Sequence, residues 1–432
     1  MKSERPKVLH EICGRPLLWY VVRALRAAGV GAMTVVTNAQ IEDYVNRLEL
    51  GIARQEEQLG TGHAVMAALA AMTPGSGPIL IASGDMPLVE PALFRSVLAA
   101  VSGDTALALV TAKMPLPSNF GRVVRRKNGA VRRIVEVRDC SADELAINEM
   151  NAGIYAFDET ALRDAVAKLR NNNAQAEYYL TDTIELLVRA GKPVVPVIAS
   201  DHRSVLGIND RAELALAGHI LNQAICREHM LAGVSISDPA TTYLEPGLEI
   251  GRDTTLLPGT IISGATTIGA GCEIGPRSRI RNTRIGDNVR ITESVVTDSS
   301  IDENVSIGPF AQIRNGAHLH RDVRIGNFTE VKASELHENV KANHLAYLGD
   351  ASVGKNTNIG AATITCNYDG KQKHRTTIGE NVKIGSDTML RAPITVGDGA
   401  STGAGSVVIH DVAPGETVAG NPAKPIKKKV ES

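Results

Sequence analysis

Aliphatic residues in the second half of the chain recur at every sixth position. The pattern runs from Ile250 to Ile280, resumes after a one-residue slip from Ile301 to Val331, and returns from Ile378 to Val408. Glycine frequently follows the aliphatic residue. A six-residue repeat of this length is typical of a parallel β-helix, in which three hexads form one triangular coil with the aliphatic side chains inside.

The first half has a different pattern, in which apolar runs alternate with helical periodicity. Residues 17–29 (LLWYVVRALRAAG) predict an amphipathic helix that ends at Gly29, whereas residues 32–37 and 77–85 contain short apolar strands. This alternation predicts an α/β domain with a mostly parallel sheet and helices on both faces. In sheets of this kind, ligands bind beyond the carboxyl ends of the strands.

Between the two halves, residues 209–233 carry apolar positions at helical spacing. Asn209 or Asp210 is a suitable N-cap and Gly233 a suitable stop, so this stretch predicts a connector helix. The expected division is therefore a first domain over 1–208, a connector over 209–233 and a repeat domain over 234–432.

The composition limits the classes of partner that we expect for this chain. With a net charge of −1 and balanced signs, the chain offers no basic surface to nucleic acid or to anionic lipid, and we expect neither as a partner. No apolar run reaches the roughly 18 residues of a membrane span. The five cysteines are scattered and lack metal-ligand spacing, which predicts reduced thiols in a cytoplasmic protein. Aromatic residues make up only 3%, as expected if a narrow prism of aliphatic side chains forms half of the chain.

Two interruptions of the repeat indicate where chemistry is carried. The stretch 331–354 contains His344, and the stretch 365–377 must leave the prism as a loop. His344 is either a corner residue or a general base. Arg314 and Lys332 are separated by one full coil of three hexads, so they should stack and could clamp a phosphate, although either alone would be ordinary surface charge.

In the first half, three features suggest binding chemistry. The Gly-Thr-Gly within residues 56–72 (EEQLGTGHAVMAALAAM) is either an ordinary helix start or a place where free backbone N–H groups meet a phosphate or base edge. Asp85 ends an apolar strand, where it could hold Mg²⁺ against a pyrophosphate or cap a helix. Asn209 could cap the connector helix.

Together these segments resemble one family over essentially the whole chain: the bifunctional UDP-N-acetylglucosamine pyrophosphorylase and glucosamine-1-phosphate N-acetyltransferase of bacterial cell-wall precursor synthesis (GlmU type). The matching segments are PKVLH (6–10), EQLGTGHA (57–64), GDMPL (84–88), FGRVVR (120–125), NAGIY (151–155), NNNAQAEYYLTD (171–182), IGPFAQIR (307–314), IGNFTEVK (325–332), HLAYLGDASVG (344–354) and IGAATITCNYDG (359–370). The resemblance implies a Rossmann-like nucleotidyltransferase domain followed by a left-handed parallel β-helix of hexapeptide repeats. It also implies a homotrimer with sites between neighbouring prisms.

For the second half, the resemblance implies acetyl transfer from acetyl-CoA to the amine of glucosamine 1-phosphate. His344 would be the base that deprotonates the ammonium. The implied residues for the sugar phosphate are Arg314, Lys332, Tyr347 and Asn358, and those along the acetyl-CoA path are Ala361, Asn367, Tyr368, Ser386 and Ala404. Where the family often has an arginine at coenzyme A, this chain has Asn421, and Lys424 or Lys427 would take over that contact.

For the first half, the resemblance implies uridylyl transfer from UTP to N-acetylglucosamine 1-phosphate, with release of pyrophosphate and Mg²⁺ as cofactor. The implied residues are Lys7 on the phosphates, Gln55, Gly60 and Thr61 on uracil, Ser83, Gly84 and Asp85 near the ribose and metal, Gly121, Glu136 and Asn151 on the sugar, and Asp85 and Asn209 on Mg²⁺.

The start of the chain departs from the family pattern. In the family, PKVLH follows a first strand and a glycine-rich loop of the form LAAGxGTRM, whereas here Met1 stands where that motif ends. Because those glycines cradle the nucleotide phosphates, we expect the chain as written to transfer acetyl groups but to show little or no uridylyl transfer, with a loosened first half. A start site placed too far downstream is favoured over a natural loss of activity.

Two other functions remain open from the residues. One is a sugar-phosphate nucleotidyltransferase whose β-helix is only regulatory, and the other is a non-catalytic assembly subunit with the same two-part layout. The excursion at 365–377 and His344 argue against the first, because a scaffold needs neither. Assays for acetyl transfer and uridylyl transfer would separate all three.

Overall fold

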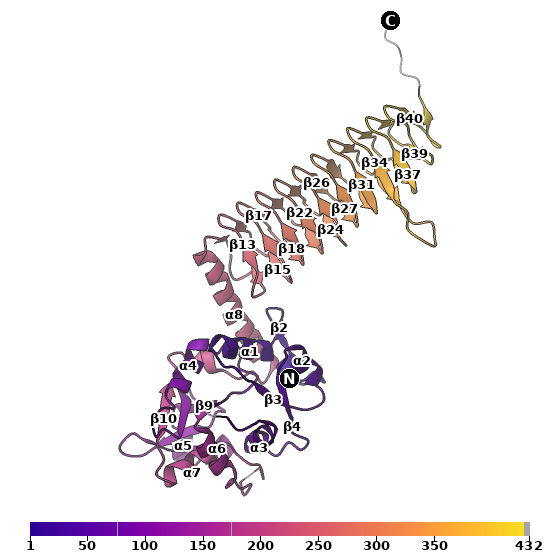
Figure 1. Cartoon of the computed structure of the whole chain (residues 1–432). Helices are drawn as coiled ribbons and strands as arrows, with labels where there is room; N and C mark the ends of the chain where they lie inside the picture. The colour runs from indigo at the N-terminus through magenta and orange to yellow at the C-terminus, as the bar shows by residue number, and fades with distance from the viewer. Residues whose placement is uncertain (76, 174, 427–432) are drawn as a thin grey trace. The chain divides into compact units, whose positions relative to one another are not determined.

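The computed structural model describes residues 1–75, 77–173 and 175–426, and the chain divides into two compact units, Met1–Gly218 and His219–Ser432 (Figure 1). The described residues include all five cysteines, and no disulfide joins any two of them. Within the same described ranges, no helix combines the length and the apolar character needed to cross a bilayer.

The first unit contains both helices and strands, which alternate over most of Leu17–Ala99. Its helices are η1 (Lys7–Leu9), α1 (Leu17–Ala27), α2 (Glu42–Arg47), α3 (Thr61–Ala71), α4 (Pro91–Ala99), η2 (Val137–Asp139), α5 (Ala142–Leu145), α6 (Glu159–Val166), α7 (Asp182–Arg189) and η3 (His202–Val205). Its strands are β1 (Glu11–Ile12), β2 (Arg15–Pro16), β3 (Thr34–Thr37), β4 (Gly51–Arg54), β5 (Ile79–Ile81), β6 (Leu107–Lys113), β7 (Arg122–Arg125), β8 (Val131–Val135), β9 (Glu149–Phe157) and β10 (Val194–Ile198).

The sheet of this unit is mixed, so the expectation of a mostly parallel sheet is wrong. The strand order is β10-β6-β9-β7-β8, with β5 also paired to β9. Of its hydrogen-bonded pairs of neighbours, β10–β6 is parallel, whereas β9 is antiparallel to β5, β6 and β7, and β7 is antiparallel to β8. The parallel pair β3–β4 stands apart, and within the described part of the chain no ladder joins it to β5. A strand buried on both faces has the same apolar run in either direction, so the sequence pattern could not separate the two.

Both faces of this sheet are covered, as expected. Leu107 and Leu109 of β6 pack in one core with α3, α6 and α7. The intervening Ala108 and Val110 pack in a second core with α1 and α4. The alternation of β6 side chains between two helical layers explains why its whole apolar run is buried.

A long helix, α8 (Arg211–Leu231), occupies most of the stretch where a connector helix was expected, and the boundary between the two units lies inside it. Asp210 is its N-cap, because its Oδ1 accepts a hydrogen bond of 2.8 Å from the backbone N–H of Glu213. Glu213 in turn accepts from the N–H of Asn209. The side chain of Asn209 is therefore not needed as the cap.

The second unit is a three-sided prism of short strands (Figure 1). The first sheet contains β11 (Ser235–Ile236), β14 (Thr255–Leu256), β17 (Glu273–Ile274), β20 (Arg290–Ile291), β23 (Ser306–Ile307), β26 (Arg324–Asn327), β29 (Lys341–His344), β32 (Asn358–Ile359), β35 (Lys383–Ile384), β38 (Ser401–Thr402), β40 (Thr417–Ala419) and β41 (Lys424–Pro425). The second contains β12 (Tyr243–Leu244), β15 (Ile261–Ser263), β18 (Arg279–Arg281), β21 (Val295–Thr297), β24 (Gln312–Arg314), β27 (Glu330–Lys332), β30 (Tyr347–Gly349), β33 (Ile364–Cys366), β36 (Met389–Arg391) and β39 (Val407–Val408). The third contains β13 (Glu249–Ile250), β16 (Thr267–Ile268), β19 (Arg284–Ile285), β22 (Ser300–Ile301), β25 (His318–Leu319), β28 (Glu335–Leu336), β31 (Ala351–Val353), β34 (Thr376–Ile378) and β37 (Ile394–Val396). This confirms the expected fold class, a left-handed parallel β-helix of hexapeptide repeats.

The repeat is shorter in places than the sequence pattern suggested, and the expected single slip is wrong. On the strands β18 to β22 the buried aliphatic residues are Ile280, Ile285, Ile291, Val296 and Ile301. Most of the intervals between them are one position shorter than a hexad, so the ladder partners Ile285 and Ile301 are closer in sequence than three full hexads would place them. A side of the prism can lose one turn residue as long as the next aliphatic side chain still stacks inside, which a count of strict hexads does not foresee.

The expected loop leaves the prism between β33 and β34, where Figure 1 shows a projecting segment. Thr365 before it and Ile378 after it are both buried at inward positions. The coil that runs from Val353 to its ladder partner Ile378 is therefore longer than three hexads. Residues 367–375 form the loop, which leaves the stacked coils after β33 and returns to them at β34.

Candidate functional site

In the prism, Arg314 and Lys332 are direct ladder partners on β24 and β27, so the predicted stacking of two cations is confirmed. Arg314 donates from Nε to Glu330 Oε1 at 2.8 Å. Lys332 Nζ lies 3.3 Å from Asp350 Oδ2, and only 8% of the Lys332 side chain is exposed. A nearly buried ammonium of this kind is held in a fixed position.

A third cation joins them from the projecting loop. Lys373 lies against Lys332, whose ammonium lowers the pKa of Lys373 first through direct contact and then through its charge, with a smaller effect from Arg314. Three cations thus meet two carboxylates, Glu330 and Asp350. The excess positive charge favours an anion. The sequence pattern did not indicate Lys373, because a loop outside the repeat has no fixed register.

His344 ends β29 and is exposed. Its Nδ1 lies 3.1 Å from Oδ1 of Asn327, its ladder partner on β26. An amide oxygen can only accept, so Nδ1 carries the proton and Nε2 keeps its lone pair. This tautomer suits a base whose Nε2 faces outward. Asn327 was not among the predicted residues, although its spacing of one shortened coil before His344 could have indicated it.

Further predicted residues join the same network. Asn367 donates from Nδ2 to the Asp350 carboxylate and lies 3.4 Å from the Tyr347 hydroxyl. A polar chain therefore runs from Lys332 through Asp350 and Asn367 to Tyr347. Asn358 lies on the next coil after His344, exposed on β32, as the ladder partner of Lys341.

Three of the residues expected along acetyl-CoA, Ala361, Ser386 and Ala404, lie along one edge of the prism. The carbonyl of Ala361 accepts from Asp387 N at 2.6 Å, and the carbonyl of Ser386 accepts from Gly405 N at 2.8 Å, directly after Ala404. These three residues therefore lie on successive coils, and their short side chains add little bulk to this edge of the prism.

Tyr368 is 61% exposed on the projecting loop, where its hydroxyl donates to the Gly370 carbonyl at 2.8 Å. Near the C-terminus, Lys424 is exposed on β41, in the same sheet as the strand that precedes Ser386. Lys427 lies outside the described residues.

In the first unit, three predicted residues that are distant in sequence meet. The Lys7 ammonium forms an ion pair with the Asp85 carboxylate and donates to Asn209 Oδ1 at 3.0 Å. They come from η1, from the loop after β5 and from the residue before the Asp210 cap. Asp85 is not a helix cap, because α4 begins only at Pro91. Carboxylate and amide oxygens are ligands that Mg²⁺ accepts, and Lys7 bridges them here.

A pocket of about 190 Å³ opens beside Lys7. It is lined by Pro6, Lys7, Val8, Val36, Thr37, Asn38, Ile41, Gln55 and Gln58. The Gln55 amide lies 3.0 Å from His63 Nδ1 and donates to the Gly60 carbonyl at 3.2 Å. The predicted uracil residues Gln55 and Gly60 are therefore brought together next to the predicted phosphate residue.

The Gly-Thr-Gly segment begins α3, as in the first of the two interpretations. Gly62 donates its N–H to the Tyr178 carbonyl at 2.7 Å, so that group is not available to a ligand. Thr61 Oγ1 accepts from Leu180 N at 3.1 Å. Gly60 has φ +100°, and a Cβ there would lie 2.7 Å from the Tyr178 carbonyl. Glycine is needed at this position to dock the helix start against 178–180.

The residues expected around the sugar also gather. Asn151 N donates to the Gly121 carbonyl at 2.8 Å, and a Cβ at Gly121 would lie 3.3 Å from Glu136 Oε2. Thr181 donates to Glu136 at 3.1 Å, and burial raises the pKa of the Glu136 carboxyl. The Asn151 amide donates to the Tyr155 hydroxyl at 2.6 Å. These groups form a semi-buried polar cluster.

The remaining two predicted residues, Ser83 and Gly84, directly precede Asp85 in the sequence. A Cβ at Gly153 would lie 3.8 Å from Ser83 Oγ, which places Ser83 beside the strand that carries Asn151. Gly84 faces Leu18, whose Cδ1 would lie 3.2 Å from an added Cβ. Gly84 thus lets the chain pass closely over α1 and brings Asp85 towards Lys7.

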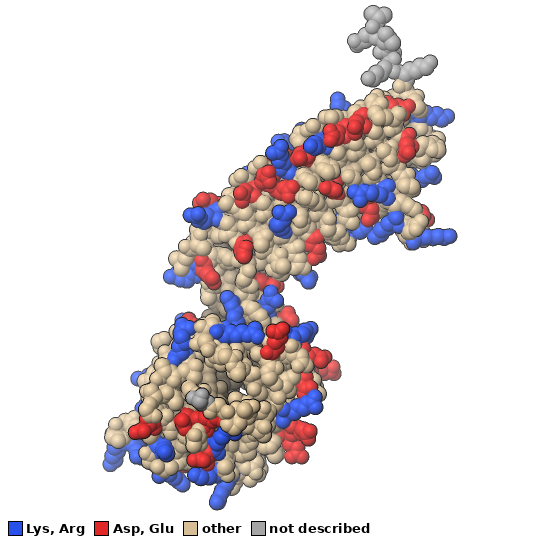
Figure 2. Space-filling view, viewed as in Figure 1, with Lys and Arg blue, Asp and Glu red and all other residues tan. Residues whose placement is uncertain are grey.

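Charge is mixed on the face of each unit seen in Figure 2, where Lys and Arg alternate with Asp and Glu. This face carries no extended field of one sign. The cationic cluster around Lys332 is therefore a local feature that suits a small anion.

Known proteins match both units. Residues 1–201 match the family model of the MobA-like NTP transferase domain, and residues 375–410 match the bacterial transferase hexapeptide (six repeats).

Curated relatives match nearly the whole chain. The "Bifunctional protein GlmU" of Trichlorobacter lovleyi is 44% identical over 96% of this chain and 91% of its own length. The protein of the same name from Geobacillus sp. is 44% identical over 95% and 90%, and that of Streptomyces avermitilis is 42% identical over 96% and 88%.

Proposed function

Because the chain belongs to the GlmU family of bifunctional proteins, we propose that it makes UDP-N-acetylglucosamine by two successive transfers. The prism moves an acetyl group from acetyl-CoA to glucosamine 1-phosphate. The first unit then moves a uridylyl group from UTP to N-acetylglucosamine 1-phosphate and releases pyrophosphate. The observation that carries this proposal is the cluster of Arg314, Lys332 and Lys373 on the prism, which supports a sugar-phosphate site one coil from a correctly oriented histidine.

His344 acts as the general base. Its Nε2 takes a proton from the substrate ammonium, and the resulting amine attacks the thioester carbonyl. The C–N bond forms as the C–S bond breaks, the thiolate of coenzyme A leaves, and the second proton lost by the nitrogen passes to that thiolate. Asn327 holds the Nδ1–H tautomer through its 3.1 Å contact and keeps Nε2 directed outward.

The cationic cluster positions the other end of the substrate. Phosphate oxygens accept from Arg314, Lys332 and Lys373, which relieves the repulsion between the two adjacent ammonium groups. Asp350, supported by Asn367, keeps Lys332 in place. Tyr347 and Asn358 contact the sugar, while Ala361, Asn367, Tyr368, Ser386 and Ala404 border acetyl-CoA, and Lys424 supplies its cationic contact.

In the first unit, the polar groups divide between the two substrates. Lys7 binds the UTP phosphates, Gln55, Gly60 and Thr61 border the uracil, and Ser83 and Gly84 border the ribose. Gly121, Glu136 and Asn151 hold the sugar. Asp85 and Asn209 fit Mg²⁺, which would neutralise charge on the triphosphate when bound. Lys7 then turns from the carboxylate of Asp85 to the phosphates.

Self-association completes the acetyltransferase site. Phe310 and Phe328 stack at one corner of the prism with ring centroids 5.6 Å apart, each more than half exposed, followed by the exposed Leu345 next to His344. All three adopt positive φ, which is unfavourable for bulky residues. An exposed apolar ridge beside the base supports contact with a neighbouring prism, and we assign the assembly as a homotrimer.

Two assays on the same preparation test the proposal. Coenzyme A release with glucosamine 1-phosphate measures acetyl transfer, and pyrophosphate release from UTP and N-acetylglucosamine 1-phosphate with Mg²⁺ measures uridylyl transfer. Both activities are expected, and acetyl transfer without uridylyl transfer would contradict the second step of the proposal. Uridylyl transfer without acetyl transfer would favour a regulatory prism instead.

A further inference from the structure

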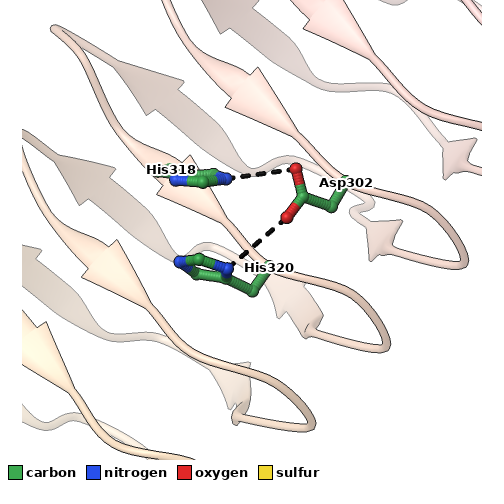
Figure 3. A group of neighbouring side chains, drawn as sticks. All are labelled: Asp302, His318 and His320. Carbon is green, nitrogen blue, oxygen red and sulfur yellow. Dashed lines mark hydrogen bonds and ion pairs between the residues drawn. The ribbon is translucent and has the colours of Figure 1, made fainter.

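The third sheet of the prism carries a cluster of imidazoles and carboxylates that the proposed reactions do not use. We propose that Asp302, His318 and His320 bind one Zn²⁺ ion per chain (Figure 3). Each of the three residues can offer one ligand atom, and these atoms lie within 4.8 Å of one another. Imidazole and carboxylate together suit Zn²⁺, whereas Mg²⁺ prefers oxygen ligands alone.

The repeat places these side chains. Asp302 and His320 each directly follow an inward aliphatic residue and stack on successive coils, because Asp302 N donates to the Leu319 carbonyl at 2.9 Å. His318 precedes the same inward residue, Leu319, on β25. All three side chains therefore project from one face of the third sheet, away from the ladder of Arg314 and Lys332 in the second sheet.

Two of the spacings between ligand atoms are close to those of a tetrahedral site. His318 Nε2 lies 3.1 Å from Asp302 Oδ1, and His320 Nδ1 lies 3.4 Å from Asp302 Oδ2. With zinc–ligand bonds of about 2.0–2.1 Å, the corners of a tetrahedron lie about 3.3 Å apart. Figure 3 shows both rings pointing at the one carboxylate, so a small rotation of the side chains brings three ligands onto one ion. Water takes the fourth position.

A neighbouring residue selects which nitrogen of His320 binds. His320 Nε2 lies 3.0 Å from Glu335 Oε1, on the opposite side of the ring from Asp302. A carboxylate that accepts the second N–H of an imidazole fixes its tautomer and orients it toward a metal. Glu335 is thus a positioning residue, and it leaves Nδ1 of His320 for the ion.

The alternative trio of His320, Glu335 and His337 would need the same ring. Because His320 is common to both, one ion per chain is expected. The His337 ring stacks on His320 with centroids 4.8 Å apart and serves as packing in this assignment. Arg284 is 3.9 Å from Asp302 but 68% exposed, so it can swing into solvent when the ion binds.

Isothermal titration of ZnCl₂ into the full-length chain, free of any histidine tag, stripped with a chelator and kept in excess Mg²⁺, tests the site. One Zn²⁺ per chain is expected. Asp302→Asn, His318→Ala and His320→Ala should each weaken binding at least roughly 100-fold, and Glu335→Gln about tenfold. His337→Ala and the surface control His410→Ala should bind as the wild type does.

Thermal melts, as a second measurement, distinguish loss of the proposed site from misfolding of the variant and from zinc binding at cysteines. Zn²⁺ should raise the thermal midpoint of the wild type but not that of His320→Ala, because only an ion bound to the folded state stabilises it. All variants should keep acetyl transfer, which shows that the prism is intact. Equal zinc affinity in His320→Ala and wild type, or a loss in His337→Ala as large as in His318→Ala, would overturn the assignment.

Discussion

Removal of Lys332 from the cationic cluster of Arg314, Lys332 and Lys373 should weaken substrate binding more than it slows catalysis. Lys332→Ala deletes an ammonium that is almost fully buried and in contact with Asp350 and Lys373. A charge-assisted hydrogen bond to a phosphate contributes roughly 1.5–3 kcal/mol, which corresponds to about a 10- to 150-fold increase in KM for glucosamine 1-phosphate. The KM for acetyl-CoA should change less, because Asn367, one of the residues proposed to border acetyl-CoA, reaches Lys332 indirectly, through its hydrogen bond to Asp350.

The variant should remain folded. Asp350 loses its ion-pair partner but keeps the hydrogen bond from Asn367 and some contact with solvent. The expected cost is about 1–3 kcal/mol against a stability of roughly 5–15 kcal/mol for a domain. Arg281→Ala, which removes an exposed cation from the same sheet on an earlier coil, is the matched control.

The assay is steady-state release of coenzyme A by the wild type and by Lys332→Ala, each measured with glucosamine 1-phosphate and with glucosamine. The four values form a double-mutant cycle in which the substrate phosphate is the second partner. Loss of the substrate phosphate should cost the wild type much more than it costs Lys332→Ala, because in the variant part of the phosphate contact is already gone. Equal costs in the two proteins, or equal use of both sugars by the wild type, would refute the clamp.

Three other predictions concern the histidine, the metal and the buried carboxyl. Asn327→Ala should lower kcat roughly 2- to 12-fold with little change in KM. Asn327→Asp keeps an acceptor for His344 Nδ1 and should restore activity. Equal kcat values for the wild type, Asn327→Ala and Asn327→Asp would refute the positioning role of Asn327. Asp85→Asn should raise the Mg²⁺ concentration needed for pyrophosphate release and leave acetyl transfer unchanged, and an unchanged Mg²⁺ dependence would exclude Asp85 as a ligand. Burial raises the pKa of Glu136, so its contribution to stability is present at low pH and is lost as the pH rises through the raised value; Glu136→Gln should flatten this trend in thermal melts, and an identical pH trend would contradict it.

The periodicity in the sequence was enough to predict the prism and the pairing of Arg314 with Lys332, because a ladder converts a separation of one coil into a contact. The same rule failed where coils are shorter. Asn327 precedes His344 by a shortened coil, and a strict coil would have pointed to Gly326. Lys373 was out of reach for a different reason, since its loop has no repeat.

In the first unit, residue types at strand and helix ends pointed to Asp85 and Asn209, the family resemblance added Lys7, and folding brings the three into contact. The direction of the strands was not predictable, because apolar runs look alike in parallel and antiparallel sheets. The sequence left open whether Asn209 or Asp210 caps α8, and in the structure Asp210 does. Local propensity alone does not decide which of two adjacent polar residues caps a helix.

The central claim is that His344 is the base of an acetyltransferase built on the prism, and single-turnover acetylation of glucosamine 1-phosphate tests it most directly. A positioned base contributes roughly 10²–10⁴ in rate, so His344→Ala should be slower by about that factor while it binds acetyl-CoA as tightly as the wild type does. A loss of less than about threefold in a folded variant that still binds both substrates would contradict the claim.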